Sequence, residues 1–263
     1  MLPTSERTGL EPLPSANVLG YEVAVCTLEE AARWCLAAVQ QQPAHPAETR
    51  LVITLNPEII VQARSNPALQ EALAAAALTV ADGVGVVWAA RCCGAALPER
   101  VPGVELVSRL LEIGGDGLKV FFLGSKPGVA ERAAAAARSH YGTRVAGVQH
   151  GYFARPDDTP DVLNRVRDSG AQLLLAGLGE GQELFLFEHR HALSVPLLLG
   201  VGDTLDVLAG EVQRTPAWTR RAGLEWAYRV GSDRKRWHRF PRLLTFTRLV
   251  LRESRGVRPD RQP

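Results

Sequence analysis

RLVITLNPEIIVQA, residues 50–63, contains the pattern on which the fold depends. After Arg50 the chain runs through Leu-Val-Ile-Thr-Leu without the polar alternation of a half-exposed strand, which is typical of a strand buried on both faces of a parallel sheet. Asn56 and Pro57 then begin a helix that we expect to end at Ala63, because Asn is a favoured helix cap and Pro suits the first helical position. A buried strand joined directly to a helix is the repeating unit of an α/β fold.

The same order of strand and helix recurs along the chain. The other expected strands lie at residues 78–81, 119–124, 144–149, 172–179 and 196–202. The other expected helices lie at residues 29–40, 67–76, 84–93, 127–140, 160–168 and 182–191. Thr27 and Glu30 form a capping box before the first of these helices, and Asn66, followed by Pro67, caps the second. The alternation predicts an α/β fold with a Rossmann-like, mainly parallel sheet flanked by helices.

Glycines or small polar residues follow nearly every expected strand. They are Asn56, Asp82-Gly83, Gly124-Ser125, Gly177 to Gly181, Gly200 and Gly202. The carboxyl ends of parallel strands meet at one edge of the sheet, where backbone N–H groups and helix N-termini face ligands, so we expect the active site at this edge. For any one turn, the alternative is that glycine only ends the strand and permits a tight turn.

Charge is distributed unevenly along the chain. Residues 1–210 contain 16 Lys and Arg against 23 Asp and Glu, whereas residues 211–263 contain 14 against 5. We therefore expect a flexible leader (1–17), an α/β catalytic domain (18–210) and a basic, helical C-terminal appendage (211–263). Aromatic residues are interleaved with the cations of the appendage, so a helix there could offer both to an anionic surface, either phospholipid or nucleic acid. These aromatic residues are Trp218, Trp226, Tyr228, Trp237, Phe240 and Phe246.

The sequence disfavours several classes of protein. No stretch reaches the roughly 18 apolar residues of a membrane span, and the N-terminus has no apolar run of secretory length. The four cysteines form no C-x-x-C pair and the histidines no H-x-x-x-H pair, so we expect a reduced, cytoplasmic setting and no metal site. The dinucleotide fingerprint and the P-loop motif are missing, which disfavours a nicotinamide oxidoreductase and a P-loop enzyme. We expect no cofactor.

Five polar residues at the predicted edge are candidates for chemistry. Asp82 either caps the helix that follows it or acts as a base in the cleft, and its position alone favours capping. Thr54 and Asn56 could hydrogen-bond a sugar, although an Asn before Pro is also an ordinary helix cap. Arg100 could hold a diphosphate by a forked contact, with a solvated loop arginine as the plain alternative. Gln182 could contact a uracil or ribose edge, or only cap a helix.

Seven segments between about residue 18 and residue 250 carry a family resemblance. They are TLNPEIIVQARSNPALQEAL, TVADGVGVVWAAR, ERVPGVEL, VFFLGSKPGVAERAA, LAGLGEGQE, GVGDTLDVLAG and QRTPAWTRRAGLEWAYRV. Together, in this order, they resemble the WecG/TagA/CpsF family of bacterial glycosyltransferases, glycosyltransferase family 26. The resemblance implies an inverting transfer of an N-acetylmannosamine-type sugar, or a related hexose or uronic acid, from a UDP donor. The implied acceptor is GlcNAc on undecaprenyl diphosphate, or a similar lipid-linked sugar, in the synthesis of bacterial surface polysaccharide.

The family's roles fall by position on the candidates named above. Asp82 matches the proposed base that takes a proton from the acceptor hydroxyl, and this overturns the preference for capping. Thr54 and Asn56 match the family's Thr and Asn at the end of the preceding strand. Arg100 matches its loop arginine, and Gln182 matches its glutamine, so these four residues are implied to bind substrate.

The resemblance also assigns a role to the appendage. The family's appendage is thought to bring the protein to the membrane and to place arginines over the diphosphate, and these positions fall on Arg229, Arg236 and Arg239. This chain departs from the family at Glu180-Gly181, where the family has Pro-Lys. It also departs at Asp203, where the family has Ala, and at Arg234, where it has Pro. The first two departures touch loops on the donor side and bear on which sugar is transferred.

These observations lead to a set of expected partners. We expect a UDP-sugar, a lipid-diphosphate-linked acceptor and an anionic membrane surface, with the protein peripherally associated with the inner face of the cell membrane and working without a metal. The sequence leaves open a homo-oligomer formed when the appendage detaches. The competing hypothesis is a nucleic-acid-binding protein with a nucleotide-binding α/β body. Against nucleic acid, the appendage has no zinc, basic-zipper or RNP pattern, and the body is acidic.

Overall fold

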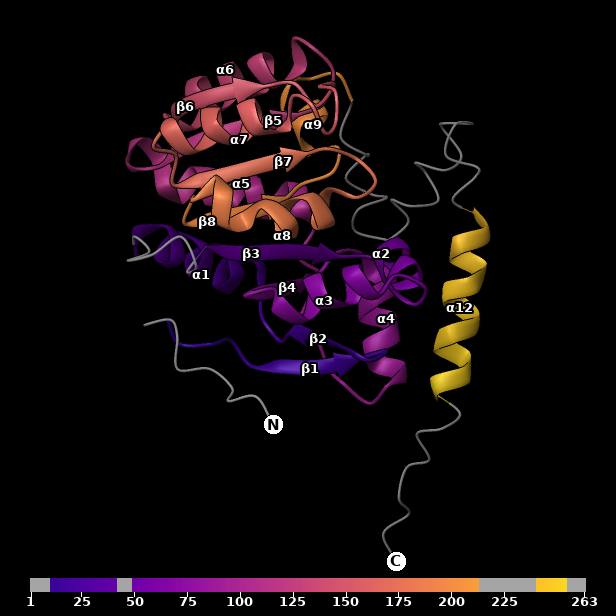
Figure 1. Ribbon diagram of the computed structural model, residues 1–263. Coiled ribbons are helices and arrows are strands. Elements are labelled where there is room, and N and C mark those ends of the chain that lie inside the picture. Colours follow the sequence, from indigo (N-terminus) through magenta and orange to yellow (C-terminus); the bar gives the residue numbers. More distant parts are fainter. Residues whose placement is uncertain (1–9, 42–48, 213–239, 255–263) are drawn as a thin grey trace, which may run out of the picture.

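The computed structural model describes residues 10–41, 49–212 and 240–254. At its centre lies a six-stranded sheet in the order β4-β3-β8-β7-β5-β6 (Figure 1). Its strands are β3 (Arg50–Leu55), β4 (Leu78–Ala81), β5 (Lys119–Gly124), β6 (Arg144–Gln149), β7 (Leu173–Gly177) and β8 (Leu197–Gly200). All neighbouring strands pair in parallel. The predicted α/β fold with a Rossmann-like parallel sheet is therefore confirmed.

The central strands are buried on both faces. Along β3, Ile53 and Leu55 belong to one apolar core, whereas Val52 belongs to the core on the opposite face. On β5, Phe121 and Phe122 divide in the same way between the two cores. Because successive side chains of a strand point to opposite faces, a strand covered on both sides needs apolar residues at every position. This requirement explains the unbroken apolar runs in the sequence.

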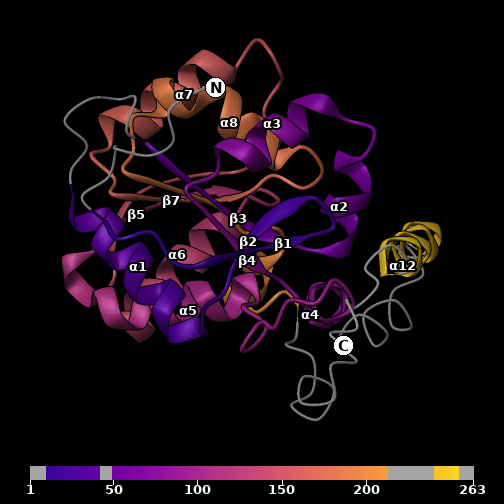
Figure 2. The ribbon, with the colours of Figure 1, turned by 90° about the horizontal axis from the view of Figure 1, so that it is seen from below.

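Helices cover both faces of the sheet (Figures 1 and 2). One core contains residues of α2 (Pro57–Ala63), α3 (Pro67–Ala75), α7 (Thr159–Asp168) and α8 (Gln182–Leu193). The other contains residues of α1 (Leu28–Gln40), α5 (Gly103–Gly114), α6 (Val129–Tyr141) and α9 (Thr204–Leu208). A short 3₁₀ helix, η2 (Gly115–Gly117), follows α5. The helices after β3 and β8 thus leave to opposite faces, an arrangement that opens a crevice between the carboxyl ends of these neighbouring strands.

The predicted capping signals at the first helices are confirmed. Thr27 Oγ1 accepts a hydrogen bond from the Glu30 N–H at 3.2 Å, and the Glu30 carboxylate accepts one from the Thr27 N–H at 2.7 Å. Asn56 caps α2 and Asn66 caps α3, each followed by a proline in the first turn. Local sequence therefore determines where α1, α2 and α3 begin.

A two-stranded antiparallel hairpin, β1 (Ser15–Val18) and β2 (Tyr21–Ala24), precedes α1 and was not predicted. It begins at Ser15, inside the range 1–17 that we expected to form a flexible leader. Ser15 Oγ donates to the Glu22 carboxylate across the hairpin at 2.7 Å, and Val18 and Val23 are buried in the core. The sequence signal is weak because both strands have four residues and the turn lacks the usual Asn-Gly pair.

Residues 240–254 of the appendage form helix α12 (Phe240–Ser254), as predicted for part of this region. The helix packs against α2 and against α4 (Val84–Cys92), near the carboxyl edge of the sheet (Figure 1). Phe246 is only 3% exposed and its ring centroid lies 6.3 Å from that of Trp88. We had counted Phe246 among aromatics available to an anionic surface, and this is wrong because the ring is buried between helices. Trp218, Trp226, Tyr228 and Trp237 lie outside the described residues.

Candidate functional site

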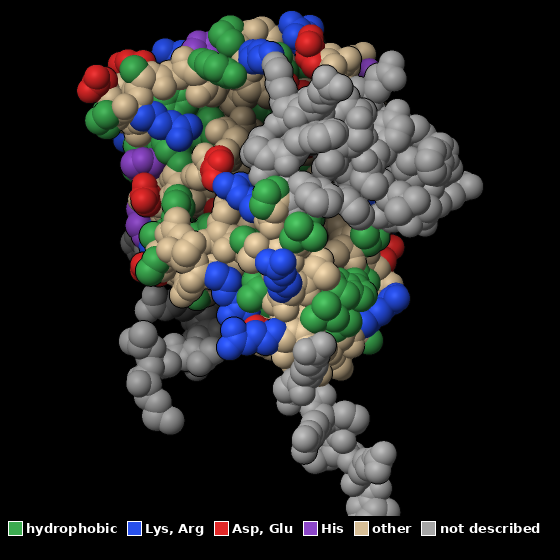
Figure 3. All heavy atoms as spheres, turned by 90° about the vertical axis from the view of Figure 1, so that its right-hand side faces the viewer, with side chains coloured by type: hydrophobic (Ala, Val, Ile, Leu, Met, Phe, Trp, Pro, Cys, Tyr) green, Lys and Arg blue, Asp and Glu red, His purple; other side chains and the backbone are tan. Residues whose placement is uncertain are grey.

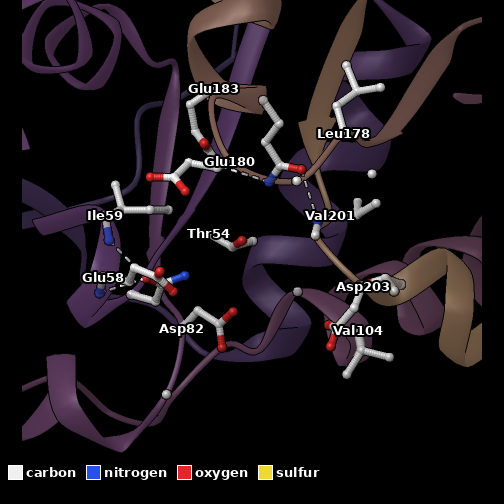
Figure 4. A pocket seen from close by; sticks show the side chains of 18 of the residues that line it. Thr54, Glu58, Ile59, Asp82, Val104, Leu178, Glu180, Glu183, Val201 and Asp203 are labelled. Atoms are coloured by element: carbon white, nitrogen blue, oxygen red, sulfur yellow. Dashed lines mark hydrogen bonds between the residues drawn. The ribbon is translucent and has the colours of Figure 1, made fainter. Parts of the chain in front are cut away.

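A cavity of about 1200 Å³ lies at the carboxyl edge of the sheet (Figure 4). Its wall contains residues from the segments that follow all six strands of the parallel sheet, together with residues of α12. The cavity includes the crevice between β3 and β8, where the following helices diverge. It occupies the edge at which the glycine-rich turns predicted an active site.

Asp82 lines this cavity directly after β4 (Figure 4). Its backbone N–H donates to the Leu55 carbonyl at 2.7 Å, which continues the pairing of β4 with β3 for one more residue. Gly83 is the N-cap of α4, its φ is +91°, and the helix has no side-chain cap. Asp82 therefore does not cap α4, although its position in the sequence favoured that role. Its carboxylate is placed in the wall of a cavity large enough for a substrate.

Thr54 and Asn56 lie on the neighbouring strand end and also line the cavity. Thr54 is buried and its hydroxyl donates to the Gly200 carbonyl at 3.4 Å, so its oxygen remains an acceptor. Asn56 Oδ1 accepts from the N–H groups of Glu58 and Ile59 at 2.9 and 3.0 Å. The capping alternative for Asn56 is thus correct. Among the described residues its amide nitrogen has no partner, so that nitrogen is able to donate to a ligand.

Arg100 lies in the loop between α4 and α5 and lines the same cavity. The N–H of its neighbour Val101 donates to the Ala81 carbonyl at 2.7 Å, and this bond holds the loop against the end of β4. The Arg100 guanidinium forms an ion pair with Glu105 on α5 at 3.5 Å, and its side chain is largely buried. Arg100 is therefore not the solvated loop arginine of the plain alternative.

Gln182 begins α8 and is 6% exposed. Its Oε1 accepts from the Gly202 N–H at 3.2 Å, and its Nε2 donates to Glu183 Oε1 at 2.8 Å. The side chain thus ties the start of α8 to the loop between β8 and α9. A Cβ added to Gly200 would come within 3.1 Å of Gln182 Nε2, so glycine leaves room for the amide. Gln182 lines the cavity, but it also holds two parts of the wall together.

Glu183 is a buried carboxylate in the cavity wall that the sequence did not single out (Figure 4). Burial raises its pKa above the ordinary value of 4.5, and the hydrogen bond from Gln182 only partly opposes this. A Glu in the first turn of a helix normally complements the helix dipole in solvent, so no local pattern indicates that Glu183 is buried. Only the position of α8 against β3 and β8 removes this carboxylate from water.

Two further parts of the wall come from the loops after β5 and β6. Ser125, which has a φ of +54°, donates its hydroxyl hydrogen to Asp206 at 2.7 Å. Arg155 stacks over the rings of Phe153 and Phe185, with its guanidinium carbon 4.9 and 4.8 Å from their centroids. For Phe153 and Arg155 the signal was an aromatic and cationic segment, GYFAR, just after an expected strand.

Acidic side chains outnumber basic ones in the described wall. The carboxylates belong to Glu58, Asp82, Glu180, Glu183, Asp203 and Asp206. The cations belong to Arg100, Lys126, Arg155 and Arg242. A substrate that carries phosphate therefore needs further positive charge or helix N-termini at this cavity. The implied appendage arginines, Arg229, Arg236 and Arg239, lie outside the described residues, so their proximity to the cavity stays a prediction.

Three of the described helices, each nine residues or longer, begin at the cavity without a side-chain cap. They are α4, α5 and α8, whose N-caps are Gly83, Pro102 and Gly181. The first N–H groups of such helices have no intrahelical acceptor and carry partial positive charge. These helix ends supply the wall with fixed donors for an anion.

Arg242 brings α12 into the same wall. Its guanidinium pairs with Glu58 on α2 and with Glu180 in the loop after β7, the latter at 2.9 Å. Burial alone would lower the pKa of Arg242, but hydrogen bonds with both carboxylates outweigh it and leave the pKa raised. Leu243 and Thr247, on the same helix, also line the cavity. The described part of the appendage is therefore a component of the site.

Comparison with known proteins identifies the family. The sequence profile of the Glycosyl transferase WecG/TagA/CpsF family matches residues 16–260. The chain belongs to this family. It is also 32% identical over 208 residues to the N-acetylglucosaminyldiphosphoundecaprenol N-acetyl-beta-D-mannosaminyltransferase of Bacillus spizizenii (strain ATCC 23059 / NRRL B-14472 / W23). The matched region spans 78% of this chain and 80% of that relative. The family resemblance found in the seven sequence segments is confirmed.

Two features of the described residues concern the expected setting of a WecG/TagA/CpsF glycosyltransferase. Within residues 10–41, 49–212 and 240–254, no helix has the length and apolar character required to cross a membrane. In the same ranges, no three His, Cys, Asp or Glu side chains are grouped so that they could hold a metal ion. Metal independence stays a prediction.

Proposed function

We propose that this glycosyltransferase moves an N-acetylmannosamine-type sugar, or a related hexose or uronic acid, from a UDP donor to a lipid-diphosphate-linked GlcNAc or similar acceptor. The product would serve the synthesis of bacterial surface polysaccharide. The name of the Bacillus relative supports the sugar and the acceptor. The observation that carries the proposal is the Asp82 carboxylate, which lines the cavity instead of capping the helix that follows it.

The proposed mechanism is a single displacement at the anomeric carbon. Asp82 accepts the proton of the incoming acceptor hydroxyl while the hydroxyl oxygen bonds to the anomeric carbon, and UDP leaves from the opposite face with the electrons of the broken bond. The centre is thereby inverted. Thr54 can accept a hydrogen bond from the substrate and the Asn56 amide nitrogen can donate one, which would orient the reactants beside Asp82.

The departing diphosphate requires positive charge in the wall. We assign this role to Arg100, to the uncapped N-termini of α4, α5 and α8, and to the appendage arginines Arg229, Arg236 and Arg239. Donors that are fixed before the reaction stabilise developing charge without further reorganisation. In this arrangement the protein's own donors neutralise the leaving group and no metal is required.

The outward face of α12 supports docking on an anionic membrane. Leu244 and Leu251 are each 48% exposed, and Arg248 and Arg252 are exposed on the same helix. Hydrophobic and basic side chains lie beside one another on this face of the molecule (Figure 3). An interfacial helix buries such apolar side chains in the leaflet while its cations contact lipid headgroups. The inner side of α12 lines the cavity, so docking would bring the cavity to the surface that holds a lipid-linked acceptor.

A product assay tests the proposed activity. The purified full chain is incubated with a panel of UDP-sugars and a GlcNAc-diphosphate-lipid analogue, and the products are analysed by mass spectrometry. We expect one added N-acetylhexosamine, hexose or uronic acid residue per acceptor. Absence of glycosylated product with every donor would contradict the proposed function.

Reversal of charge on α12 tests the docking surface. The double variant Arg248→Glu, Arg252→Glu should sediment with anionic vesicles at least ~10-fold more weakly, since each cation near such a leaflet contributes roughly 1 kcal/mol. Binding by the wild type should fall as salt is raised. Arg167→Glu, on the exposed surface of α7, is the matched control and should bind vesicles as the wild type does. Equal sedimentation of all three proteins would refute the docking surface.

A further inference from the structure

The loop between β7 and α8 has little local structure to hold it. Gly179 and Gly181 flank Glu180 and have φ angles of +75° and +85°. Glycine adopts such angles without strain but also leaves the unfolded and locally open states many conformations. The loop leads directly to Gln182 and Glu183, both buried in the cavity wall. Because these two residues form the start of α8, the conformation of the loop contributes to where their side chains lie.

Glu180 is the side chain that links this loop to other elements. Its carboxylate accepts from Gln62 Nε2 on α2 at 3.1 Å and pairs with Arg242 on α12 at 2.9 Å. Arg242 pairs with Glu58 at the same time, so one guanidinium connects α12, α2 and the β7–α8 loop. An isolated exposed ion pair contributes little to stability, partly because both side chains must be ordered. Here Arg242 is only 31% exposed, and its one ordered side chain pairs with two carboxylates. The cost of ordering this side chain is therefore shared between two ion pairs.

Packing fixes the helix that carries this arginine. Phe246 and Val250 of α12 are buried in the core shared with α2 and α4, one and two turns beyond Arg242. At the far end of α12, Glu253 forms an ion pair with Arg64. The helix is thus held along its length, and Arg242 is presented to the loop from a rigid element.

We propose that Arg242 is a positioning residue for sugar transfer: through Glu180 it holds the β7–α8 loop and so keeps Gln182 and Glu183 in the cavity wall. The expected effect of Arg242 on the rate of sugar transfer rests on the proposed function. The bridge from Arg242 to Glu180 gives the appendage a second role, because α12 then supports the geometry of the site even when no membrane is present.

The first test measures the loop itself and needs no turnover. Hydrogen–deuterium exchange is followed on the full-length wild type and on Arg242→Gln, Glu180→Gln and the double variant. Amides within residues 178–183 should exchange several-fold faster in all three variants. In the wild type, the loop can open only if the Arg242–Glu180 ion pair breaks, and the variants lack this ion pair. Glu253→Gln is the matched control: it removes an ion pair of α12 that does not touch the loop, and exchange at residues 178–183 should stay at the wild-type level.

The second test measures transfer to a water-soluble, short-chain acceptor without vesicles. Arg242→Gln and Glu180→Gln should each lower kcat roughly 10- to 100-fold with little change in KM, since small displacements of positioning groups are costly in rate. The double variant should be no slower than the slower single variant, because both changes break one bridge. Arg242→Lys should recover part of kcat, since a lysine retains the charge but not the fork that joins two carboxylates.

The two tests separate the possible failures. Unchanged exchange at residues 178–183 in Arg242→Gln would overturn the inference. So would a raised KM in Arg242→Gln together with a wild-type Glu180→Gln, because Arg242 would then bind substrate directly. Additive losses in the double variant would also overturn it. If the wild type transfers no sugar to any acceptor, the proposed function fails, but the exchange experiment still decides whether Arg242 holds the loop.

Discussion

The two halves of the cavity wall are built in different ways. On the side of β3 and β4, Asn56 and Asp82 directly follow their strands. The Asn56 side-chain oxygen bonds to N–H groups two and three positions away, and the Asp82 backbone N–H bonds to the adjacent strand. On the side of β7 and β8, Gln182 bonds to Gly202, 20 residues further along, and Glu180 pairs with Arg242, 62 residues further along. The first half is held by local structure and the second by distant contacts.

The two kinds of anchoring predict different effects of substitution. In the β3–β4 half, a polar side chain can be changed with a small loss of stability, since the backbone pairing of the strands holds its position. In the β7–β8 half, the polar side chains are themselves the connections between loops. Substitutions there should affect stability as well as activity.

The largest expected effect is loss of turnover in Asp82→Asn. Removal of a general base typically lowers kcat by ~10²- to 10⁴-fold, whereas the isosteric amide preserves the shape of the wall. Thermal unfolding should change little, because the amide fills the same space and keeps an oxygen that accepts hydrogen bonds. Steady-state kinetics and calorimetry measure the two quantities, with exposed Asp116→Asn as the matched control. A near wild-type rate for Asp82→Asn would remove the base from the proposed mechanism.

The next effect is on stability, in the other half of the wall. Gln182→Ala leaves the partly buried Gly202 N–H and the buried Glu183 carboxylate without this partner, which should lower the free energy of unfolding by about 1–3 kcal/mol. Asn56→Ala, the matched change on the β3 side, removes a helix cap and should lower it by only ~1 kcal/mol. Urea unfolding measures both. A larger loss in Asn56→Ala than in Gln182→Ala would reverse the comparison between the two halves.

The smallest effect is a dependence of stability on pH. Burial raises the pKa of Glu183 above its ordinary value of 4.5, so the folded protein binds this proton more tightly than the unfolded chain does. The contribution of Glu183 to stability is therefore complete below pH 4.5 and is lost as the pH rises through the folded pKa. The amide of Glu183→Gln stays neutral at all these pH values. The free energy of unfolding of this variant should therefore exceed that of the wild type at pH 7, and the difference should be smaller in acid. Urea titrations across this range should show the convergence, and a difference that is constant with pH would contradict it.

Individual residues show what could be predicted from the sequence and what could not. The positions of the parallel strands along the chain, the caps of α1 to α3 and the edge that holds the cavity were predicted correctly, because each follows from a pattern within about ten residues. Asp82 shows the limit of such patterns: an acid before a helix start is most often a cap, yet the turn at Gly83 leaves α4 without one. The hairpin of β1 and β2 was missed because its strands are short and its stability depends on burial against the body.

Glu183, Arg242 and the Ser125–Asp206 contact could not have been found from local sequence. Each depends on elements that lie far apart in the chain, and an acid or a cation in a helix normally faces solvent. Phe246 is the converse case, since an aromatic residue in a basic segment suggested an exposed face and the ring is buried against α4.

The α/β class, the family and the strand ends that carry the candidate base and its polar neighbours can be read from the sequence, because the spacing of apolar residues, the turn residues and the helix caps specify them locally. The sequence does not show which distant side chains share one cavity, which carboxylate is buried or which face of α12 is packed. Burial and ion pairing depend on which other elements a helix or loop contacts in the folded protein, and these contacts join residues too far apart for any local pattern.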